Sequence, residues 1–220
     1  MRVGADRWHR LRNIAAGQCG LFTAAQARRE RVQRYELARA TLGGQLTRVH
    51  HGVYAFTDTS ADKHPFEDWA AQWLALEPEA DIGARLANPD TVISHHCAAE
   101  IQDLGTIVSA GRLHLTSARR IGVQSKNVSA YRRPIGEQGR DWNVVAGLPV
   151  SSAGRIVEDL TVCAVDGSHI GTVIADAIFE GVLDYETVAK RLDPYAARRG
   201  EASGAALVDR FTTAAGLALA

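Results

Sequence analysis

Arginine side chains recur at short spacing between residues 28 and 48 of this 220-residue chain, and two histidines follow the last of them. A guanidinium group can hold two phosphate oxygens, or the two acceptors on the edge of a guanine, through parallel hydrogen bonds. A glutamine side chain can pair with adenine in the same two-point manner. The residue types in this stretch therefore favour contact with nucleic acid. The candidate contact residues are Thr23, Gln33, Arg34, Tyr35, Arg39, Arg48, His50 and His51.

Two short helices are predicted to position these side chains. Thr23 can cap a first helix that ends near residue 31, because its hydroxyl can accept a hydrogen bond from a free amide of the first turn. A second helix begins near Val32, and Leu37 faces the core with Val32 and Leu42 as flanking apolar anchors. Gly43 and Gly44 are predicted to end this helix, since glycine adopts the left-handed cap conformation without steric cost. The candidate residues of the second helix are expected on its exposed face.

A β-hairpin is predicted directly after the second helix. The strand-like runs 46–49 and 53–56 are joined by residues 50–52, His-His-Gly, which form a tight turn signal. A further helix over residues 6–18 has apolar residues at helical spacing and would cover the back of the pair. This order of elements predicts a winged helix-turn-helix in which the hairpin is the wing. Arg48, His50 and His51 would then contact the DNA backbone or the minor groove.

The distribution of charge supports this interpretation. Residues 1–56 contain ten arginines and three acidic residues, a net charge of +7. The remaining residues contain 15 basic and 22 acidic side chains, so they carry −7 and the whole chain is neutral. A basic segment of this kind is typical of proteins that neutralise phosphates.

The rest of the chain is predicted to form a second domain. Residues 57–65 are polar and show no apolar period, so we expect a linker there between a domain over residues 1–56 and one over 66–220. The fold class is α+β, with helices and a small sheet in the second domain. Helices are predicted over residues 66–76, 82–86, 94–104, 152–160, 168–182, 184–193 and 203–219, and strands over 113–116, 128–133 and 142–150.

A second group of basic residues lies in the predicted strands. Residues 112–140 contain seven basic side chains and one acid, a net charge of +6. This group could form a second nucleic-acid surface, could bind an acidic partner, or could be the solvated face of a sheet. Its candidate residues are Arg119, Arg120, Arg132 and Arg133.

Motifs for metal binding or catalysis are weak in this sequence. His95 and His96 are adjacent, so on a helix they point about 100° apart and are poorly placed to share an ion. Glu158 and Asp159 are adjacent too, and no Cys-x-x-Cys pair or phosphate-binding glycine loop accompanies them. We therefore predict no catalytic residues, no metal and no cofactor. Three distant cysteines fit a reducing cytoplasm, and no apolar run is long enough for a membrane helix.

The stretch from Leu21 to Phe56 resembles the N-terminal domain of the AbiEi family, the antitoxins of type IV toxin–antitoxin systems. The resemblance rests on residues 21–23, Leu-Phe-Thr, and on Leu37, Leu46, Arg48-Val49 and Gly52-Val53-Tyr54. The sequence departs from the family pattern at Tyr35 and Ala40, in the second helix. Weaker matches follow at Ser94-His95, Ala98-Ala99, residues 147–152, Arg155 and Asp159.

This resemblance implies a transcriptional autorepressor that binds double-stranded DNA at its own promoter. It also implies an antitoxin that counters a nucleotidyltransferase-like toxin encoded beside it. Two alternatives stay open. One is a stand-alone winged-helix regulator whose second domain senses a ligand or mediates assembly, and the other is an enzyme with an unrecognised active site.

Overall fold

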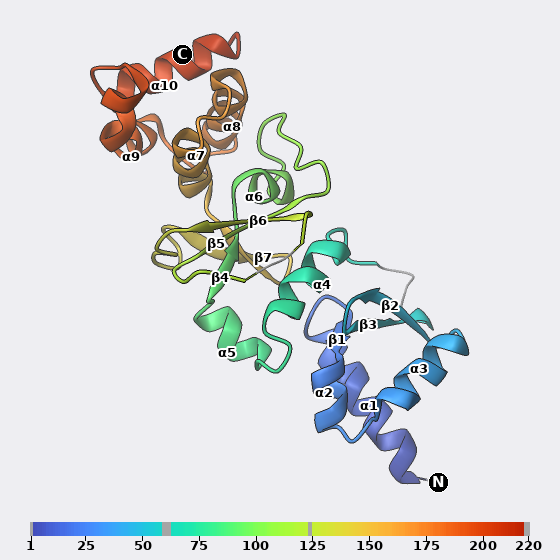
Figure 1. Cartoon of the computed structure of the whole chain (residues 1–220). Helices are drawn as coiled ribbons and strands as arrows, with labels where there is room; N and C mark the ends of the chain where they lie inside the picture. Colours follow the sequence, from blue (N-terminus) through green and yellow to red (C-terminus); the bar gives the residue numbers. More distant parts are fainter. Residues whose placement is uncertain (1, 59–62, 123–124, 218–220) are drawn as a thin grey trace. The chain divides into compact units, whose positions relative to one another are not determined.

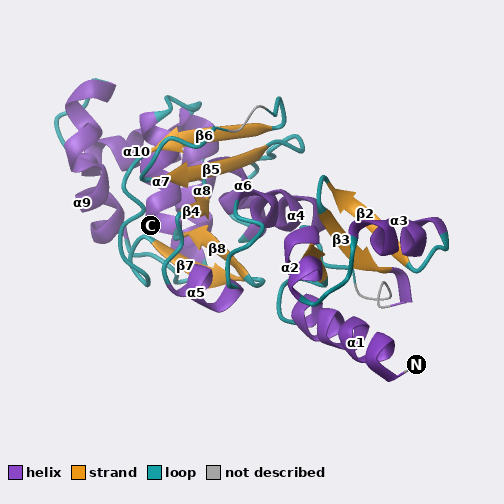
Figure 2. Cartoon of the chain, turned by 60° about the horizontal axis from the view of Figure 1, so that its bottom comes forward, coloured by secondary structure: helices purple, strands orange, loops and turns teal. Residues whose placement is uncertain are grey.

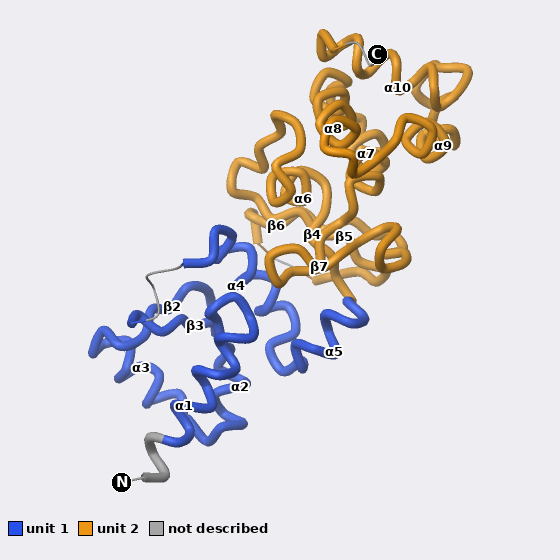
Figure 3. The backbone as a smooth tube through the Cα atoms, turned by 180° about the vertical axis from the view of Figure 1, so that it is seen from behind, with its two compact units in different colours: residues 1–89 blue, residues 90–220 orange. Residues whose placement is uncertain are grey.

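A computed structural model describes residues 2–58, 63–122 and 125–217 of the chain (Figure 1). The chain divides into two compact units, residues 1–89 and 90–220, which Figure 3 shows in separate colours. Each unit combines helices with a sheet, so the predicted α+β class is confirmed. The division falls later than the linker expected at 57–65. Those residues lie within the first unit, and residues 59–62 are outside the described part.

The first unit contains the predicted winged helix-turn-helix elements (Figure 2). Its three strands form one antiparallel sheet with the order β1-β3-β2, in which β1 precedes α2 and α3 in the chain. Its elements in chain order are α1 (Arg2–Ala16), β1 (Leu21–Thr23), α2 (Ala24–Arg29), α3 (Arg34–Leu42), β2 (Leu46–His50), β3 (Val53–Phe56), α4 (Glu67–Leu76) and α5 (Ile82–Ala87).

One apolar core joins the helices of the first unit to its sheet. Leu11 of α1, Leu37 of α3 and Phe56 of β3 are all buried in this core, together with Phe22 of β1. Phe22 and Phe56 have ring centroids 5.2 Å apart, a spacing typical of attractive aromatic pairs. Helix α4 packs on all three strands of the same sheet. For that reason α4 belongs with the helix-turn-helix elements, although it was expected to open the second domain.

Residues 21–23 form a strand that the sequence did not predict. The sequence assigns a role only to Thr23, as a helix cap, but Leu21, Phe22 and Thr23 pair with Ala55, Tyr54 and Val53 of the hairpin. All three are buried, and three residues are too few to show the alternation that indicates a strand. Thr23 does cap α2 as predicted, because its hydroxyl accepts a hydrogen bond from the Gln26 amide.

The second unit is built on a mixed five-stranded sheet with the order β6-β5-β4-β8-β7. The predicted strands over 113–116, 128–133 and 142–150 are confirmed, the last as two strands joined by a turn. The short central strand β4 was not predicted. The strands are β4 (Thr91–Ile93), β5 (Leu113–Ser117), β6 (Val128–Arg132), β7 (Trp142–Val145) and β8 (Leu148–Ser151).

Helices pack on this sheet and on one another in the second unit. Helix α10 lies against both α8 and α9, and glycines allow the close approach. A Cβ atom on Gly171 would lie 2.1 Å from the Phe211 carbonyl oxygen, and one on Gly204 would lie 1.9 Å from that of Ala189. The helices are α6 (His95–Ile101), α7 (Ala153–Val162), α8 (Gly167–Phe179), α9 (Tyr185–Ala196), the 3₁₀ turn η2 (Ala197–Arg199) and α10 (Gly204–Ala214).

Candidate nucleic-acid interface

A four-residue turn joins α2 to α3 and sets the direction of the second helix. Arg31 adopts the left-handed conformation at φ 61°, and the Val32 amide then donates a hydrogen bond to the Ala27 carbonyl. Val32 is buried beneath the turn, as predicted. Helix α3 ends at Gly43, and Gly44 takes a left-handed φ of 70°, so the predicted glycine stop is confirmed.

Helix α3 presents a wide exposed face. Leu37 and Ala40 are its buried residues, and they face the core of the first unit. Arg34, Ala38 and Arg39 are exposed, and Tyr35 is 71% exposed. Gln33, just before the helix, is exposed as well. The four candidate residues predicted on this helix therefore lie at the surface.

Leu42 does not act as the apolar anchor that the sequence suggested. Its side chain is 90% exposed, while Ala40 fills the buried position instead. Helical geometry explains the error, because Leu42 lies five residues after Leu37 and so points about 140° away from it. Only Leu37 and Ala40 share the inward face of this short helix.

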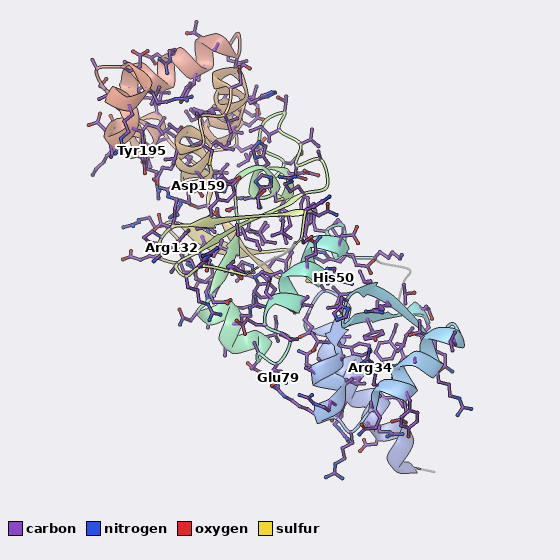
Figure 4. All side chains as sticks on the ribbon, viewed as in Figure 1. Arg34, His50, Glu79, Arg132, Asp159 and Tyr195 are labelled. Atoms are coloured by element: carbon purple, nitrogen blue, oxygen red, sulfur yellow. The ribbon has the colours of Figure 1, made fainter. Side chains whose placement is uncertain are left out.

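The hairpin carries the other candidate residues of the first unit. Arg48 and His51 are exposed, and a guanidinium nitrogen of Arg48 lies 2.8 Å from His51 Nδ1 across the turn. His50 is half-buried, and its Nδ1 is enclosed without a hydrogen-bond partner in the described part of the chain. Gly52 closes the turn at φ 74°. Figure 4 labels Arg34 on α3 and His50 on the hairpin.

Thr23 lies apart from this surface. It is 1% exposed, and its hydroxyl donates to the Pro78 carbonyl while it caps α2. The buried hydroxyl thus makes both of its hydrogen bonds within the first unit, and Thr23 is not part of the exposed surface.

Most arginines outside α3 and the hairpin are compensated by acids. The sequence count of +7 over residues 1–56 omits Asp58 and Glu79, which follow that segment and fold back onto it. The ion pairs in question are Arg7–Glu36 at 2.6 Å, Arg10–Asp6 and Arg10–Glu30 at 2.5 Å each, Arg12–Asp58 at 2.7 Å and Arg28–Glu79 at 2.5 Å.

Arg31, Arg34, Arg39 and Arg48 form no ion pair among the residues that the structure describes. They lie on the turn, on α3 and on the hairpin. Positive charge without an internal partner is thus concentrated on the elements that a helix-turn-helix presents to DNA. Arg29 of α2 also forms no ion pair in the described part of the chain, and its guanidinium donates to the Glu79 carbonyl instead.

The comparisons with known proteins agree with this geometry. Residues 9–57 match the AbiEi antitoxin family of transcriptional regulators. The matched segment runs from α1 to the end of the hairpin, so the resemblance to AbiEi is confirmed for the segment that carries the exposed arginines. A comparison with curated proteins finds no match.

A solved structure resembles most of the chain. The crystal structure of the RV2827C protein from Mycobacterium tuberculosis aligns with 93% of this chain and 75% of its own, at a TM-score of 0.52 and 16% sequence identity. At that identity the likeness concerns the fold alone.

The four candidate residues of the second basic group, in the second unit, have different environments. Arg133 pairs with the buried Asp159 and donates to the Tyr195 hydroxyl at 3.1 Å. Arg119 pairs with Asp90 at 3.0 Å. Arg120 and Arg132 are exposed and have no acidic partner in the described residues. Of the four candidate residues of the second surface, Arg120 and Arg132 are therefore the two that are exposed without an acidic partner in the described residues.

Asp159 is the centre of a buried ionic cluster in the second unit (Figure 4). Its Oδ1 accepts from Arg155 at 2.9 Å and from Arg133, so it joins α7 to the segment after β6. Arg155 also donates to the Pro134 carbonyl at 2.8 Å. Glu158 points away and pairs with Arg191 at 2.6 Å, as expected for adjacent residues on a helix. The sequence analysis named Arg133, Arg155 and Asp159 separately but did not connect them, because Arg133 is 26 residues from Asp159.

Histidines and a tyrosine stack beside this cluster. The His95 ring lies 3.7 Å from that of Tyr131, and His95 Nδ1 is 2.8 Å from the Ser94 hydroxyl. Burial lowers the pKa of His95 to about 3 and that of His114 to about 4, so both rings are neutral near pH 7. The described residues contain no group of three or more metal-ligating side chains arranged for an ion. None of the described helices is long and apolar enough to cross a membrane.

Proposed function

We propose that the chain is a DNA-binding transcriptional regulator that acts as the antitoxin and autorepressor of a type IV toxin–antitoxin operon. The observation that carries the DNA-binding part is the set of unpaired arginines on the turn, α3 and the hairpin. Arginines kept for stability alone would be expected to pair with acids, as Arg7, Arg10, Arg12 and Arg28 do. The match of residues 9–57 to AbiEi regulators supports the antitoxin part.

In this proposal α3 enters the major groove and the hairpin lies along the backbone. Arg34 and Arg39 are the candidates for base or phosphate contact on α3, and Gln33 precedes them. Arg48 and His51 supply charge on the wing, where phosphate or minor-groove contact is expected. The proposal assigns no catalytic step to the chain and requires no cofactor.

The test of DNA binding uses the full chain and a fragment that holds the promoter of its own operon. Binding is measured by fluorescence anisotropy over 50–300 mM salt, because neutralised phosphates release counterions and make affinity fall steeply with salt. We expect tighter binding to the promoter than to random DNA of equal length. An affinity independent of salt, or equal on the two DNAs, contradicts the proposal.

Substitutions assign the roles of individual arginines. Arg39→Ala or Arg34→Ala should weaken promoter binding more than random-DNA binding where a base contact is lost, by roughly 1–3 kcal/mol. Equal losses on both DNAs would mark a phosphate contact. Arg10→Ala is the matched control, because it removes the same charge from a side chain that two acids already compensate. It should leave the preference for the promoter unchanged.

The antitoxin part requires a toxin gene beside this one. Co-expression with the adjacent nucleotidyltransferase-like toxin should restore growth, and survival of the cells is the measurement. Failure of rescue with normal promoter binding would favour the stand-alone regulator.

A further inference from the structure

Two large apolar side chains lie on the face of α3 that points away from the core. Leu42 is 90% exposed and Tyr35 is 71% exposed. They are seven residues apart, close to two full turns, so they lie on one line along the helix. Leu37 and Ala40, the buried residues of α3, are on the opposite side. A single exposed leucine is ordinary in a folded protein. An aligned pair of apolar side chains on the outer face of a basic helix indicates instead a surface that binds a partner.

The charges next to Tyr35 and Leu42 indicate which kind of partner this surface binds. Arg39 lies between Tyr35 and Leu42 along the helix and has no acidic partner in the described residues. The one acid of α3, Glu36, is held by Arg7 and by the Gln33 amide, so no free carboxylate faces an approaching phosphate. Ala38 is exposed on the same side and is small enough to permit close approach. An apolar line interrupted by an unpaired arginine fits the major groove, where the thymine C5-methyl group is the apolar feature of the base edges.

We propose that Tyr35 and Leu42 contact thymine methyl groups on either side of a guanine held by Arg39. The inference rests on the proposed DNA binding and adds the sequence class that α3 selects. The rise of 1.5 Å per residue places Tyr35 and Leu42 about 10 Å apart along the axis. That distance corresponds to about three base-pair steps of 3.4 Å. The preferred site should therefore contain two thymines about three steps apart with a guanine between them.

The test begins with the full wild-type chain and selection of bound sequences from a random duplex library. Each thymine of the selected site is then replaced in turn by uracil, which removes the methyl group and keeps both hydrogen-bond acceptors. We expect about a fourfold loss of affinity at each of two positions. That figure corresponds to the ~0.8 kcal/mol of one buried methylene at 1.4 kcal/mol per tenfold.

Protein variants then assign each methyl group to a side chain. At one of the two positions, Leu42→Ala should have the same affinity for the duplex with thymine as for the duplex with uracil. At the other position, Tyr35→Ala should show this loss of discrimination. Leu42→Met should retain the discrimination, because it keeps an apolar contact. Phe179→Ala is the matched control, since it removes an equally exposed apolar side chain, 88% exposed, from the second unit. This control should discriminate as the wild type does.

Two results would overturn the inference while leaving the proposed DNA binding intact. If the wild type binds thymine and uracil duplexes equally at every position, no methyl group is contacted. If Tyr35→Ala and Leu42→Ala keep the full discrimination, other residues contact the methyl groups. If the library shows no enrichment at all, the proposed DNA binding itself fails and the inference falls with it.

Discussion

Arg7 holds both carboxylate oxygens of Glu36, with nitrogen–oxygen distances of 2.6 and 3.2 Å. The same guanidinium donates to the Arg31 carbonyl at 2.9 Å, and the Glu36 carboxylate accepts from the Gln33 amide at 2.9 Å. Helix α1 is thereby fixed to the turn and to the first turn of α3. The orientation of the exposed face of α3 depends on this contact as well as on the apolar core.

Arg7→Ala should destabilise the first unit and loosen α3. Both side chains are more than two-thirds buried, and hydrogen bonds to charged groups contribute more than neutral ones, so we expect a loss of about 1–2 kcal/mol. Urea unfolding followed by tryptophan fluorescence measures it. Arg10→Ala, on the same helix but at an exposed pair, should shift the midpoint much less. Equal shifts for the two variants would show that the Arg7–Glu36 contact adds nothing specific.

Asp159→Asn should destabilise the second unit strongly. The substitution keeps the shape of the side chain but removes the negative charge that pairs with Arg133 and Arg155. Asp159 is 0% exposed, so water cannot replace that charge. Removing one partner of a buried ion pair costs about 3–5 kcal/mol. Circular dichroism during urea unfolding is the measurement. Glu137→Gln, at an exposed carboxylate, serves as the control, and an Asp159→Asn midpoint equal to that of this control would contradict the role of the cluster.

The buried histidines should make the second unit less stable as the pH falls below neutrality. Burial lowers the pKa of His95 to about 3 and that of His114 to about 4, whereas in the unfolded chain both are near 6.5. The unfolded state therefore binds protons first, and stability present above pH 6.5 is lost on acidification. Between pH 7.5 and 5.5 each histidine should contribute a loss on the order of 1 kcal/mol.

A variant that cannot titrate provides the control for this pH dependence. His95→Phe keeps a ring against Tyr131 and removes one proton-binding site, although it also removes the bond to Ser94. The free energies of unfolding of the variant and the wild type are not compared at a single pH. The measured quantity is the slope of each free energy of unfolding against pH. The slope of the variant should be less steep than that of the wild type by the contribution of one histidine, while His96 and His114 still contribute. An unchanged slope would show that His95 is not the titrating group.

The sequence predicted the winged segment well because its signals are local. The cap at Thr23, the glycines after α3 and the turn at Gly52 each depend on neighbours within a few residues. Strand β1 was missed because its partner Val53–Ala55 is thirty residues away and three residues show no period. The exposure of Leu42 follows from helical geometry, because Leu42 points about 140° away from the buried Leu37, whereas Ala40 lies three residues after Leu37 and shares its face.

The candidate site was predicted less completely than the fold. Charge counting identified the basic segment but gave the same weight to Arg7, which is bound by Glu36, and to Arg39, which has no acidic partner in the described residues. It likewise grouped Arg133 with Arg132, although strand alternation sends one toward Asp159 and the other to the surface. Which arginines are free depends on acids distant in sequence, and only the folded chain brings these together.

Repression and toxin neutralisation should be separable by mutation if the chain is an antitoxin of the proposed type. The unpaired arginines proposed to contact DNA lie in the first unit, while the second unit, residues 90–220, has its own sheet and buried core. We therefore expect residues 90–220 to fold when expressed alone, which circular dichroism and a cooperative thermal transition would show. A natively disordered fragment would contradict the independence of the two units.

The decisive comparison uses full-length variants in a promoter-reporter assay and in co-expression with the adjacent toxin. Arg34→Ala with Arg48→Ala removes two unpaired charges from α3 and the hairpin, so it should abolish repression and leave rescue largely intact. Arg120→Glu with Arg132→Glu reverses two exposed charges of the second basic group that have no acidic partner in the described residues, and it avoids Arg133, whose loss would disturb Asp159. Reduced rescue with normal repression in this variant would assign the second surface to neutralisation. If the first variant loses repression and rescue together while its fold and expression are intact, neutralisation acts through DNA binding and the modular interpretation is wrong.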